Sequence, residues 1–328
     1  MNSPVTVFVL AYNRPDYLLE CLHSIVHQTL SNFRIVVLDN ASATDLQPII
    51  EQVRYQSGKV IEYLRHPRNI ESIGNFRHAW YYSKTTPYFV IFHDDDIMHP
   101  EFLERSLAAM KHSGAPAWAG SQSKAFTGSA PSFPALGADM PMYLSASELA
   151  YRLLTQRCNV TFSTVIYRSD LVDSIDICAL SERHSILADR PLLFALAERH
   201  GCSLSPLPLV LYRCHPAQDS TNGPLNEDNL FSLFTAYRQV LQPLWSEQVE
   251  RDFYAWSGFH IPDGYSRLTV TKRSSLREYL QKARAMGVYR DRYFSRYLLG
   301  LVYGFFCRLR RAFAKLQQPL GEWMCFRR

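Results

Sequence analysis

Runs of apolar, β-branched residues alternate with segments of helical periodicity in the first part of the chain. Residues 5–11 form an unbroken apolar run that stops at the polar turn beginning with Tyr12, as a strand buried on both faces does. Apolar residues then recur at helical spacing up to Gln28. Further elements are expected in this order: strands at 33–38 and 60–64, a helix at 73–83 and a strand at 88–92. Strands separated by helices and short turns predict an α/β fold with a mixed, mostly parallel sheet flanked by helices.

The pattern changes twice further along the chain. Gly, Pro, Ser and Ala dominate residues 112–142, which we expect to form loops around a strand at 117–125. The elements expected next are a helix at 147–156, an extended segment at 161–167, a helix at 190–200 ended by Gly201, and a strand at 207–212. From about residue 226 strand signals disappear and helical periodicity dominates. We therefore expect an α/β domain over 1–225 and a helical region over 226–328.

The formal net charge of +5 is unevenly distributed along the 328 residues. Residues 265–328 hold 15 Lys and Arg against 3 Asp and Glu, a net charge of +12, which leaves −7 for residues 1–264. A basic segment of this kind favours a partner rich in phosphate, such as nucleic acid or anionic lipid, although a solvated helix face has the same composition. No helix-turn-helix or RNA-binding signature accompanies it, so we do not expect a nucleic-acid partner.

Cysteine spacing and hydropathy indicate the cellular compartment that we expect for the protein. The seven cysteines form no CxxC pair and no zinc-ligand pattern, so we expect reduced thiols in a cytoplasmic protein. We see no secretion signal, and the longest apolar run, 297–307, has 11 residues, whereas a bilayer span needs about 20. We therefore expect a chain that does not cross a membrane.

Motifs for dinucleotide binding, P-loops and serine hydrolases do not occur in the sequence, which disfavours those classes of enzyme.

Three consecutive carboxylates follow the strand at 88–92: Asp94, Asp95 and Asp96. Neighbouring side chains of an extended segment point to opposite sides, so we expect Asp94 and Asp96 to face one divalent cation while Asp95 turns away. A solvated acidic turn that caps the next helix would have the same sequence.

Two other strand ends bear residues suited to a nucleotide. Asp39 follows the strand at 33–38, where its carboxylate could accept hydrogen bonds from a nucleobase or a ribose. Tyr12 ends the first strand, where its ring could cover a base. Each residue alone is more often a turn former or a core aromatic. Together with the acidic cluster they lie on one edge of an open α/β sheet, which is where such sheets bind ligands.

Several short motifs follow one another in a fixed order up to Pro100. They are Val-Leu-Ala-Tyr-Asn-Arg-Pro at 9–15, Ile-Val-Val-Leu-Asp-Asn-Ala-Ser at 35–42, Asn69 with Gly74 and Asn75, and the three Asp residues at 94–96. With this series of motifs, residues 4–220 closely resemble family 2 glycosyltransferases, which have the GT-A fold.

The resemblance implies an inverting transfer of a sugar from a nucleoside diphosphate, with UDP favoured, to a hydroxyl of a saccharide or lipid-linked saccharide. The pathway it suggests is polysaccharide biosynthesis at the cell surface. By match of position, the residues that would bind the nucleotide are Ala11, Tyr12, Arg14, Asp39, Asn69, Asn75, Asp94 and Asp95. Asp96, together with Asp94, would bind the Mn²⁺ or Mg²⁺ that bridges the diphosphate. Such a cation stabilises the negative charge that develops on the leaving group.

An inverting displacement also needs a general base near the acceptor hydroxyl. In this family the base is an Asp that opens a helix beyond the metal motif. Asp189 matches that position, with Ala188 where Glu is common. The same residue could instead serve as a helix cap, with Pro191 in the first turn.

The segment after the strand at 207–212 resembles the end of the family's catalytic domain. The resemblance makes His215 a candidate ligand of the metal or donor to the diphosphate, and Arg213 a candidate for neutralising phosphate. Arg190, next to the candidate base, is a further candidate for contact with phosphate or acceptor.

The basic tail is expected to attach the protein to a membrane surface. Arg and Lys alternate with aromatic and aliphatic residues over 279–316, as in helices that lie in a lipid interface. We therefore expect peripheral binding to the anionic inner leaflet of the plasma membrane, with a homodimer or another protein interface as the alternative. Two other functions stay open at this point: a nucleotidyltransferase on a similar sheet, and a catalytically silent assembly subunit at the membrane.

Overall fold

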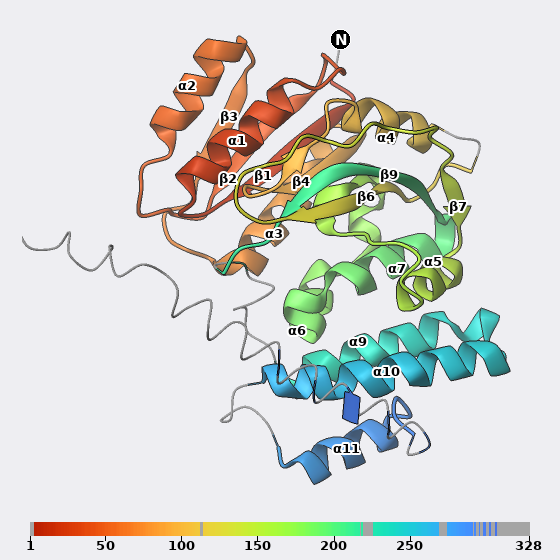
Figure 1. Ribbon diagram of the computed structural model, residues 1–328. Coiled ribbons are helices and arrows are strands. Elements are labelled where there is room, and N and C mark those ends of the chain that lie inside the picture. Colours follow the sequence, from red (N-terminus) through yellow and green to blue (C-terminus); the bar gives the residue numbers. More distant parts are fainter. Residues whose placement is uncertain are drawn as a thin grey trace, which may run out of the picture. The chain divides into compact units, whose positions relative to one another are not determined.

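A computed structural model describes residues 3–111, 114–216, 218, 226–268 and 274–290, and beyond these 292, 295, 298, 299, 302 and 306 (Figure 1). The described residues fall into two compact units. The first unit comprises those within Met1–Pro224 and Gln239–Leu244, and the second comprises those within Leu225–Arg238 and Trp245–Arg328.

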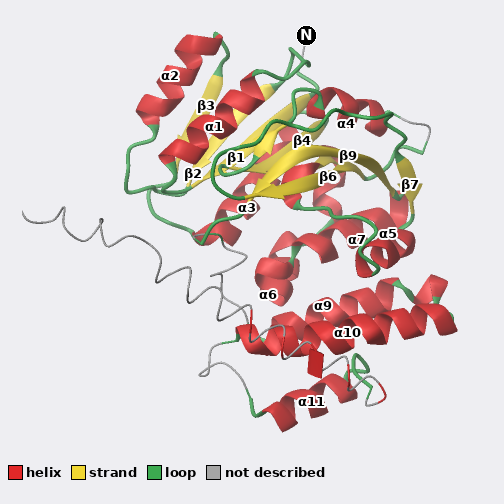
Figure 2. Ribbon diagram, in the orientation of Figure 1, coloured by secondary structure: helices red, strands yellow, loops and turns green. Residues whose placement is uncertain are grey.

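A mixed sheet forms the centre of the first unit (Figures 1 and 2). Its described strands are β1 Val5–Ala11, β2 Arg34–Asp39, β3 Ile61–Arg65, β4 Tyr88–His93, β5 Ile97–Met98, β6 Trp118–Phe126, β7 Met142–Leu144, β8 Val165–Arg168 and β9 Cys202–Arg213. They are ordered β3-β2-β1-β4-β8-β6-β9-β5, and β7 also pairs with β9. The four strands from β3 to β4 are parallel, whereas β8 is antiparallel to both of its neighbours. The expected α/β fold is confirmed.

Helices cover both faces of this sheet (Figure 2). They are α1 Pro15–Val26, α2 Gln47–Ser57, α3 Glu71–Tyr82, α4 Phe102–Met110, α5 Ala146–Leu154, α6 Ile177–His184 and α7 Asp189–His200. Leu18 and Leu22 of α1 share one buried cluster with Val7 and Val9 of β1, because alternate strand residues face the same side. On the opposite face, Trp80 of α3 packs edge-on against β4 and β8. Burial of this kind makes each large core side chain worth about 2–5 kcal/mol of stability.

The register of the parallel strands gathers their carboxyl ends at one edge. Ala11 of β1 pairs with Asp39 of β2, and Leu10 pairs with His93 of β4. The backbone amide of Asn40 continues the ladder by donating to the carbonyl of Ala11 at 2.9 Å. The polar turns after β1, β2 and β4 therefore lie next to one another, as the sequence predicts.

Element boundaries differ from the sequence predictions in a few places. β9 begins at Cys202, earlier than expected, because it pairs in succession with β7, β6 and β5. The extended segment expected at 161–167 begins with a 3₁₀ turn, Phe162–Thr164, before β8. Two helices, α2 and α6, lie in segments for which the pattern indicated none. α2 buries only Ile50 and Val53, too few apolar residues to produce a clear period.

The second unit is helical in its described part. It contains α9 Glu227–Val240 up to residue 238, α10 Glu247–Arg267 and α11 Leu276–Ala285. Tyr279 of α11 is fully buried and its hydroxyl donates to the carbonyl of Ile261 at 3.0 Å. None of the described helices has both the length and the apolar character needed to cross a bilayer. Most of the expected tail helix at 279–316 lies outside the described residues.

The end of α7 yields a test of the fold. Gly201 has a φ of +63°, and a Cβ there would lie 2.9 Å from the carbonyl oxygen of Leu144. We expect Gly201→Ala to lower the free energy of unfolding by at least about 2 kcal/mol, since strain and a backbone clash add. Gly58→Ala is the control, because Gly58 has a similar φ of +66° with open space around it. It should cost about 1 kcal/mol. Equal losses in urea unfolding would contradict the account of Gly201.

Candidate active site

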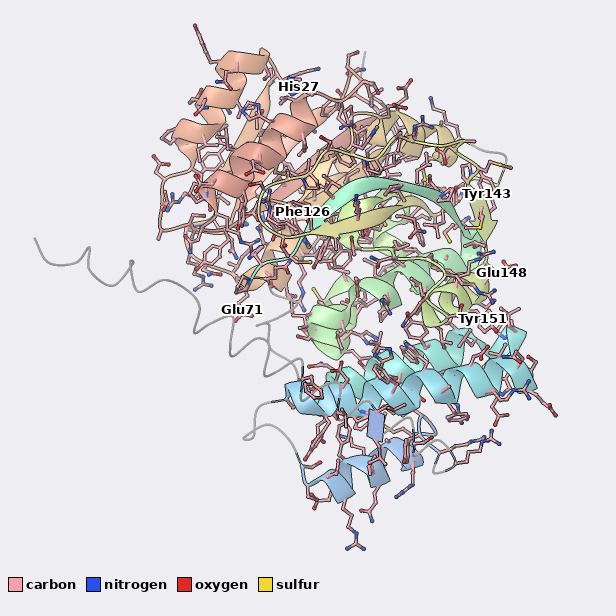
Figure 3. All side chains as sticks on the ribbon, viewed as in Figure 1. His27, Glu71, Phe126, Tyr143, Glu148 and Tyr151 are labelled. Atoms are coloured by element: carbon pink, nitrogen blue, oxygen red, sulfur yellow. The ribbon has the colours of Figure 1, made fainter. Side chains whose placement is uncertain are left out.

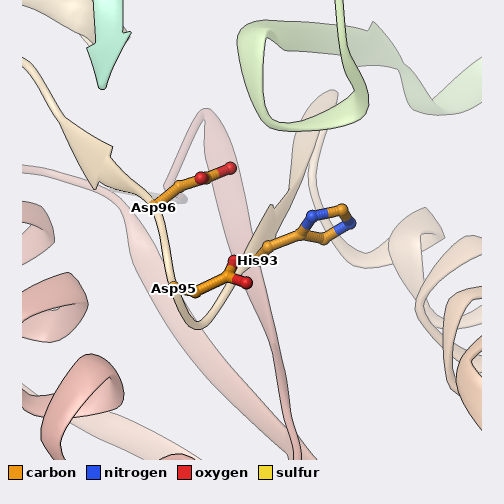
Figure 4. Close-up of side chains that lie close together, drawn as sticks. All are labelled: His93, Asp95 and Asp96. Carbon is orange, nitrogen blue, oxygen red and sulfur yellow. The ribbon is translucent and has the colours of Figure 1, made fainter. Parts of the chain in front are cut away.

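The acidic residues at 94–96 form a tight turn after β4. The strand ends at His93, and the backbone amide of Asp96 donates back to the carbonyl of His93 at 3.4 Å. Possible ligand atoms of His93, Asp95 and Asp96 all lie within 4.8 Å of one another (Figure 4). Asp95 joins Asp96 in this group, at the place where strand alternation predicts Asp94. The reason is that residues 94 and 95 turn, so alternation stops at 93.

Asp94 instead binds the residues that follow β1. Its carboxylate accepts a hydrogen bond from the backbone amide of Tyr12 at 2.9 Å and lies 3.1 Å from the guanidinium of Arg14. Burial raises the pKa of Asp94 to about 7, although the positive charge of Arg14 opposes this shift. Two of the expected nucleotide-binding residues, Tyr12 and Arg14, are thus held next to the acidic turn.

Asp95 is the carboxylate with the most positive surroundings. Arg14 approaches it at 2.5 Å, and His215 donates to it from Nε2 at 2.8 Å. Burial acts to raise the pKa of Asp95, but the hydrogen bond from His215 and the charges of His93 and Arg14 outweigh it and hold the pKa below its ordinary value. Asp95 is therefore ionised at neutral pH.

Asp96 is fully buried and incompletely satisfied. Its Oδ1 accepts from the backbone amide of Arg213 at 3.1 Å, whereas its Oδ2 has no hydrogen-bond partner among the described residues. Burial, with the nearby charge of Asp95, raises the pKa of Asp96 to about 8. A buried oxygen without a partner costs stability unless another group reaches it. Two carboxylates and an imidazole, one of them with a spare oxygen, fit a divalent cation such as Mn²⁺ or Mg²⁺.

His93 is a residue that the sequence reasoning missed. The only signal in the sequence is its place directly before the three Asp residues. Its ring completes the group in Figure 4, and its charge affects the carboxyl groups of both Asp95 and Asp189. His93 therefore lies within electrostatic range of both the acidic turn and Asp189.

Two basic residues expected to meet the ligand contact the turn itself. His215 lies against Asp95 and is not part of the three-residue group. Arg213 is 2% exposed, and its guanidinium hydrogen-bonds to the carbonyl oxygens of Asp95 and Gly128. The expected contact of Arg213 with phosphate does not match this placement, because protein groups surround a buried guanidinium on several sides.

The residues expected around the nucleobase form a hydrogen-bonded loop. The buried carboxylate of Asp39 accepts from the backbone and hydroxyl of Ser42 and from the hydroxyl of Tyr63. Burial, followed by that last bond, raises the pKa of Tyr63 to about 12. The Asn75 amide donates to the carbonyl of Leu38.

Asn69 also accepts hydrogen bonds inside this loop, from Asn40 and from the backbone amide of Glu71. These contacts shape the edge of the sheet, and they leave the ring of Tyr12, 38% exposed, as a prominent apolar surface there.

Asp189 is the first residue of α7, and Ala188 holds the cap position. The alternative role as an N-cap residue therefore does not match the helix boundary. Burial raises the pKa of Asp189, while Arg190 and the backbone amides of the first turn act to lower it. A carboxylate with a raised pKa is a stronger proton acceptor than an exposed one. Arg190 is only partly buried and lies beside it.

Sequence comparison identifies the family. A family model described as glycosyl transferase family 2 matches residues 6–174. The chain belongs to glycosyltransferase family 2. Relatives include protein CgeD of Bacillus subtilis, 26% identical over 120 residues, and an uncharacterized glycosyltransferase of Methanocaldococcus jannaschii, 31% identical over 115 residues. Each match covers 34% of this chain, and 27% and 39% of the respective relative, so the chain spans well under half of their lengths.

Solved structures of glycosyltransferases share the fold. The S. aureus TarS fragment 1–349 in complex with UDP-GlcNAc has a TM-score of 0.54 at 16% identity, covering 90% of both chains. The mannosyltransferase PcManGT of Pyrobaculum calidifontis, in complex with GDP-Man and Mn²⁺, has a TM-score of 0.50 at 11% identity, covering 96% of this chain and 88% of its own. The GT-A fold expected from the resemblance is confirmed.

The buried Asp96 generates a pH-dependent test in the metal-free protein. The unfolded chain loses the Asp96 proton near pKa 3.8, whereas the folded protein keeps it up to about 8, so this group's contribution to stability falls as pH rises between those values. We expect Asp96→Asn to remove that fall. In EDTA the melting temperature of the variant should gain on that of the wild type as pH rises from about 5 to about 8.

The matched control is Asp170→Asn. The hydrogen bond from Arg168 lowers the pKa of Asp170, so its stabilising effect is lost only as pH falls below the ordinary value of 3.8. The difference in melting temperature between this variant and the wild type should not change between the two pH values. A constant difference for Asp96→Asn as well would show that Asp96 ionises normally.

Proposed function

We propose that this protein is a metal-dependent, inverting glycosyltransferase that moves a sugar from a nucleoside-diphosphate sugar to a hydroxyl of a saccharide or lipid-linked saccharide. The observation that supports it most directly is the group of His93, Asp95 and Asp96 at the edge where the parallel strands end. Family membership and the GT-A fold agree with this reading. Mn²⁺ or Mg²⁺ held by these side chains would stabilise the charge on the departing diphosphate.

The donor would lie along the same edge. Tyr12 would cover the base with its exposed ring, and the loop ordered by Asp39 would define the space for the base and ribose. The guanidinium of Arg14 contacts both Asp94 and Asp95, and its positive charge would also attract the diphosphate. Of these residues, Tyr12 offers an apolar face and Arg14 offers charge, which are the two properties that a nucleotide requires.

Asp189 would act as the general base. The acceptor oxygen forms a bond to the anomeric carbon of the sugar as the bond from that carbon to the diphosphate oxygen breaks, and Asp189 takes the hydroxyl proton. The raised pKa of Asp189 suits this task, since a base works best when its pKa approaches the working pH. The shared influence of His93 supports the placement of the base near the acidic turn.

UDP is the favoured nucleotide, and GDP is the alternative that comparison suggests. One structural neighbour was solved with UDP-GlcNAc and another with GDP-Man. Thermal unfolding with Mn²⁺ and each nucleotide sugar in turn discriminates between them, because a bound donor stabilises the folded state by mass action. Release of nucleoside diphosphate supports a glycosyltransferase, whereas release of pyrophosphate would support a nucleotidyltransferase.

The base assignment leads to a prediction about turnover. Asp189→Asn should bind the donor as the wild type does and lower the rate of transfer by about 100- to 10,000-fold, since the carboxylate that accepts the proton is lost. Calorimetry with the donor and a product assay give the two quantities. Asp173→Asn is the control, because Asp173 is exposed and pairs with Lys84. A variant of Asp189 that retains full turnover would contradict the role and would favour a catalytically silent subunit.

We also propose that the C-terminal region binds an anionic membrane surface. In the described part of the tail, several large apolar residues in helical conformation are 48–61% exposed: Leu298, Leu299, Val302 and Phe306. Three of them, 299, 302 and 306, have the spacing of one helix face. The sequence around them has a strong excess of Arg and Lys, and each basic residue near an anionic leaflet adds about 1 kcal/mol.

Vesicle flotation tests this attachment. The full chain should float with vesicles that contain phosphatidylglycerol and much less with neutral vesicles. The triple substitution Leu299→Ser, Val302→Ser and Phe306→Ser should reduce the bound fraction by about tenfold or more, since three apolar side chains no longer enter the lipid. A control with Tyr55→Ser and Val60→Ser, which removes exposed apolar residues of the first unit, should float normally. Undiminished flotation of the triple variant would overturn the proposal.

A further inference from the structure

We propose that Arg213 is a positioning residue that holds the turn at 94–96 in the geometry required by the cation site, with Glu20 as its counter-ion. The inference rests on the function proposed above. It concerns a residue that would touch neither the donor nor the acceptor, and would act through Asp95 and Asp96.

Arg213 bonds to both acidic residues of the group in Figure 4. Its backbone amide donates to Oδ1 of Asp96 at 3.1 Å, and its Nε donates to the carbonyl oxygen of Asp95 at 2.9 Å. The bond to Oδ1 orients the Asp96 side chain so that Oδ2 is available to a ligand. The bond to the carbonyl fixes the backbone of Asp95. Since Arg213 is the last residue of β9, both bonds tie the turn to the sheet.

The guanidinium is itself held firmly. Nη1 donates to the carbonyl of Gly128 at 2.8 Å, and Nη2 lies 2.6 Å from the carboxylate of Glu20 on α1. The rings of Tyr17 and Phe126 lie 4.3 and 4.7 Å from the guanidinium carbon (Phe126 is labelled in Figure 3). A planar, forked cation can satisfy all these partners at once, whereas the point charge of lysine cannot.

The charge of Arg213 has a second effect. The turn gathers three buried carboxylates, and such a cluster is unfavourable without nearby cations. The guanidinium of Arg213 lies against the backbone of Asp95, where its charge is paired with Glu20, and it leaves Oδ2 of Asp96 available. Loss of the fork would remove the bond to the carbonyl of Asp95 and loosen that part of the turn, while the backbone amide of residue 213 could still donate to Asp96.

The experiment measures Mn²⁺ binding directly. Free Mn²⁺ is followed by electron paramagnetic resonance during titration of the full chain without donor. Arg213→Lys should raise the Kd for Mn²⁺ by about 10- to 100-fold, the range found when residues that support metal ligands are replaced. Arg54→Lys is the matched control, because Arg54 also pairs with a glutamate, Glu51, and donates to a backbone carbonyl, that of Ile61, far from the acidic turn in the sheet. Its Kd should equal that of the wild type.

The outcomes are separable. If the wild type binds no Mn²⁺, the proposed metal-dependent function fails, whatever the variants do. If the wild type binds and Arg213→Lys binds equally well, the positioning role is overturned. Melting temperatures in EDTA reveal whether Arg213→Lys has lost its fold.

If Arg213→Lys is unfolded, Glu20→Gln replaces it in the titration. This variant removes the carboxylate that holds Nη2 of Arg213, so the guanidinium is no longer fixed against the carbonyl of Asp95, with Glu51→Gln as its control. A raised Kd in Glu20→Gln alone supports the proposal, and an unchanged Kd contradicts it.

Discussion

The burial of three adjacent carboxylates in one turn is the constraint on which the site depends. Asp94, Asp95 and Asp96 are each at most 4% exposed, a placement that is unfavourable for ionised groups unless cations or protons neutralise them. The three carboxyl groups are stabilised in different ways. Arg14 contacts both Asp94 and Asp95, His215 donates a hydrogen bond to Asp95, and Asp96 keeps a proton because its pKa is raised to about 8.

The sheet makes this concentration of charge possible. Parallel β1, β2 and β4 end at one edge, so polar turns from distant parts of the sequence meet there. β9 then returns to the same region and delivers Arg213 and, shortly after it, His215. The hydrogen-bonded strands hold the three carboxyl groups close together. Among the described residues, none donates a hydrogen bond to the second oxygen of Asp96, so this oxygen is available to a cation. A divalent cation that replaced the proton of Asp96 would convert an unfavourable arrangement into a favourable one.

Most of the strands in the first unit could be predicted from the sequence, because apolar, β-branched runs that end in polar turns have few alternatives. The motifs also pointed to Tyr12 and Asp39, which lie at the ends of β1 and β2, and to Asp189, which opens α7. The sequence could not show which side chains of the acidic turn point to the same side. Strand alternation grouped Asp94 with Asp96, but the chain turns after His93, so Asp95 takes that place.

The roles of the basic residues were equally hidden in the sequence. The place of His93 directly before the acidic cluster is too weak a signal to mark it as a ligand, so His93 was missed. Arg213 seemed suited to phosphate, whereas it is buried between Tyr17 and Phe126 and donates to the backbone of the turn. These contacts join Arg213 to residues 196 and 87 positions away in the sequence, and local patterns contain no information about them.

Proton release during Mn²⁺ binding tests the central claim most directly. Calorimetric titrations at pH 7 in two buffers with different ionisation enthalpies report how many protons leave the protein for each ion bound. If the cation displaces the proton of Asp96, about one proton or more should be released, because Asp94, with a pKa of about 7, can also lose its proton. Binding of Mn²⁺ without any proton release would contradict the account, because it would mean that the buried turn was already fully ionised.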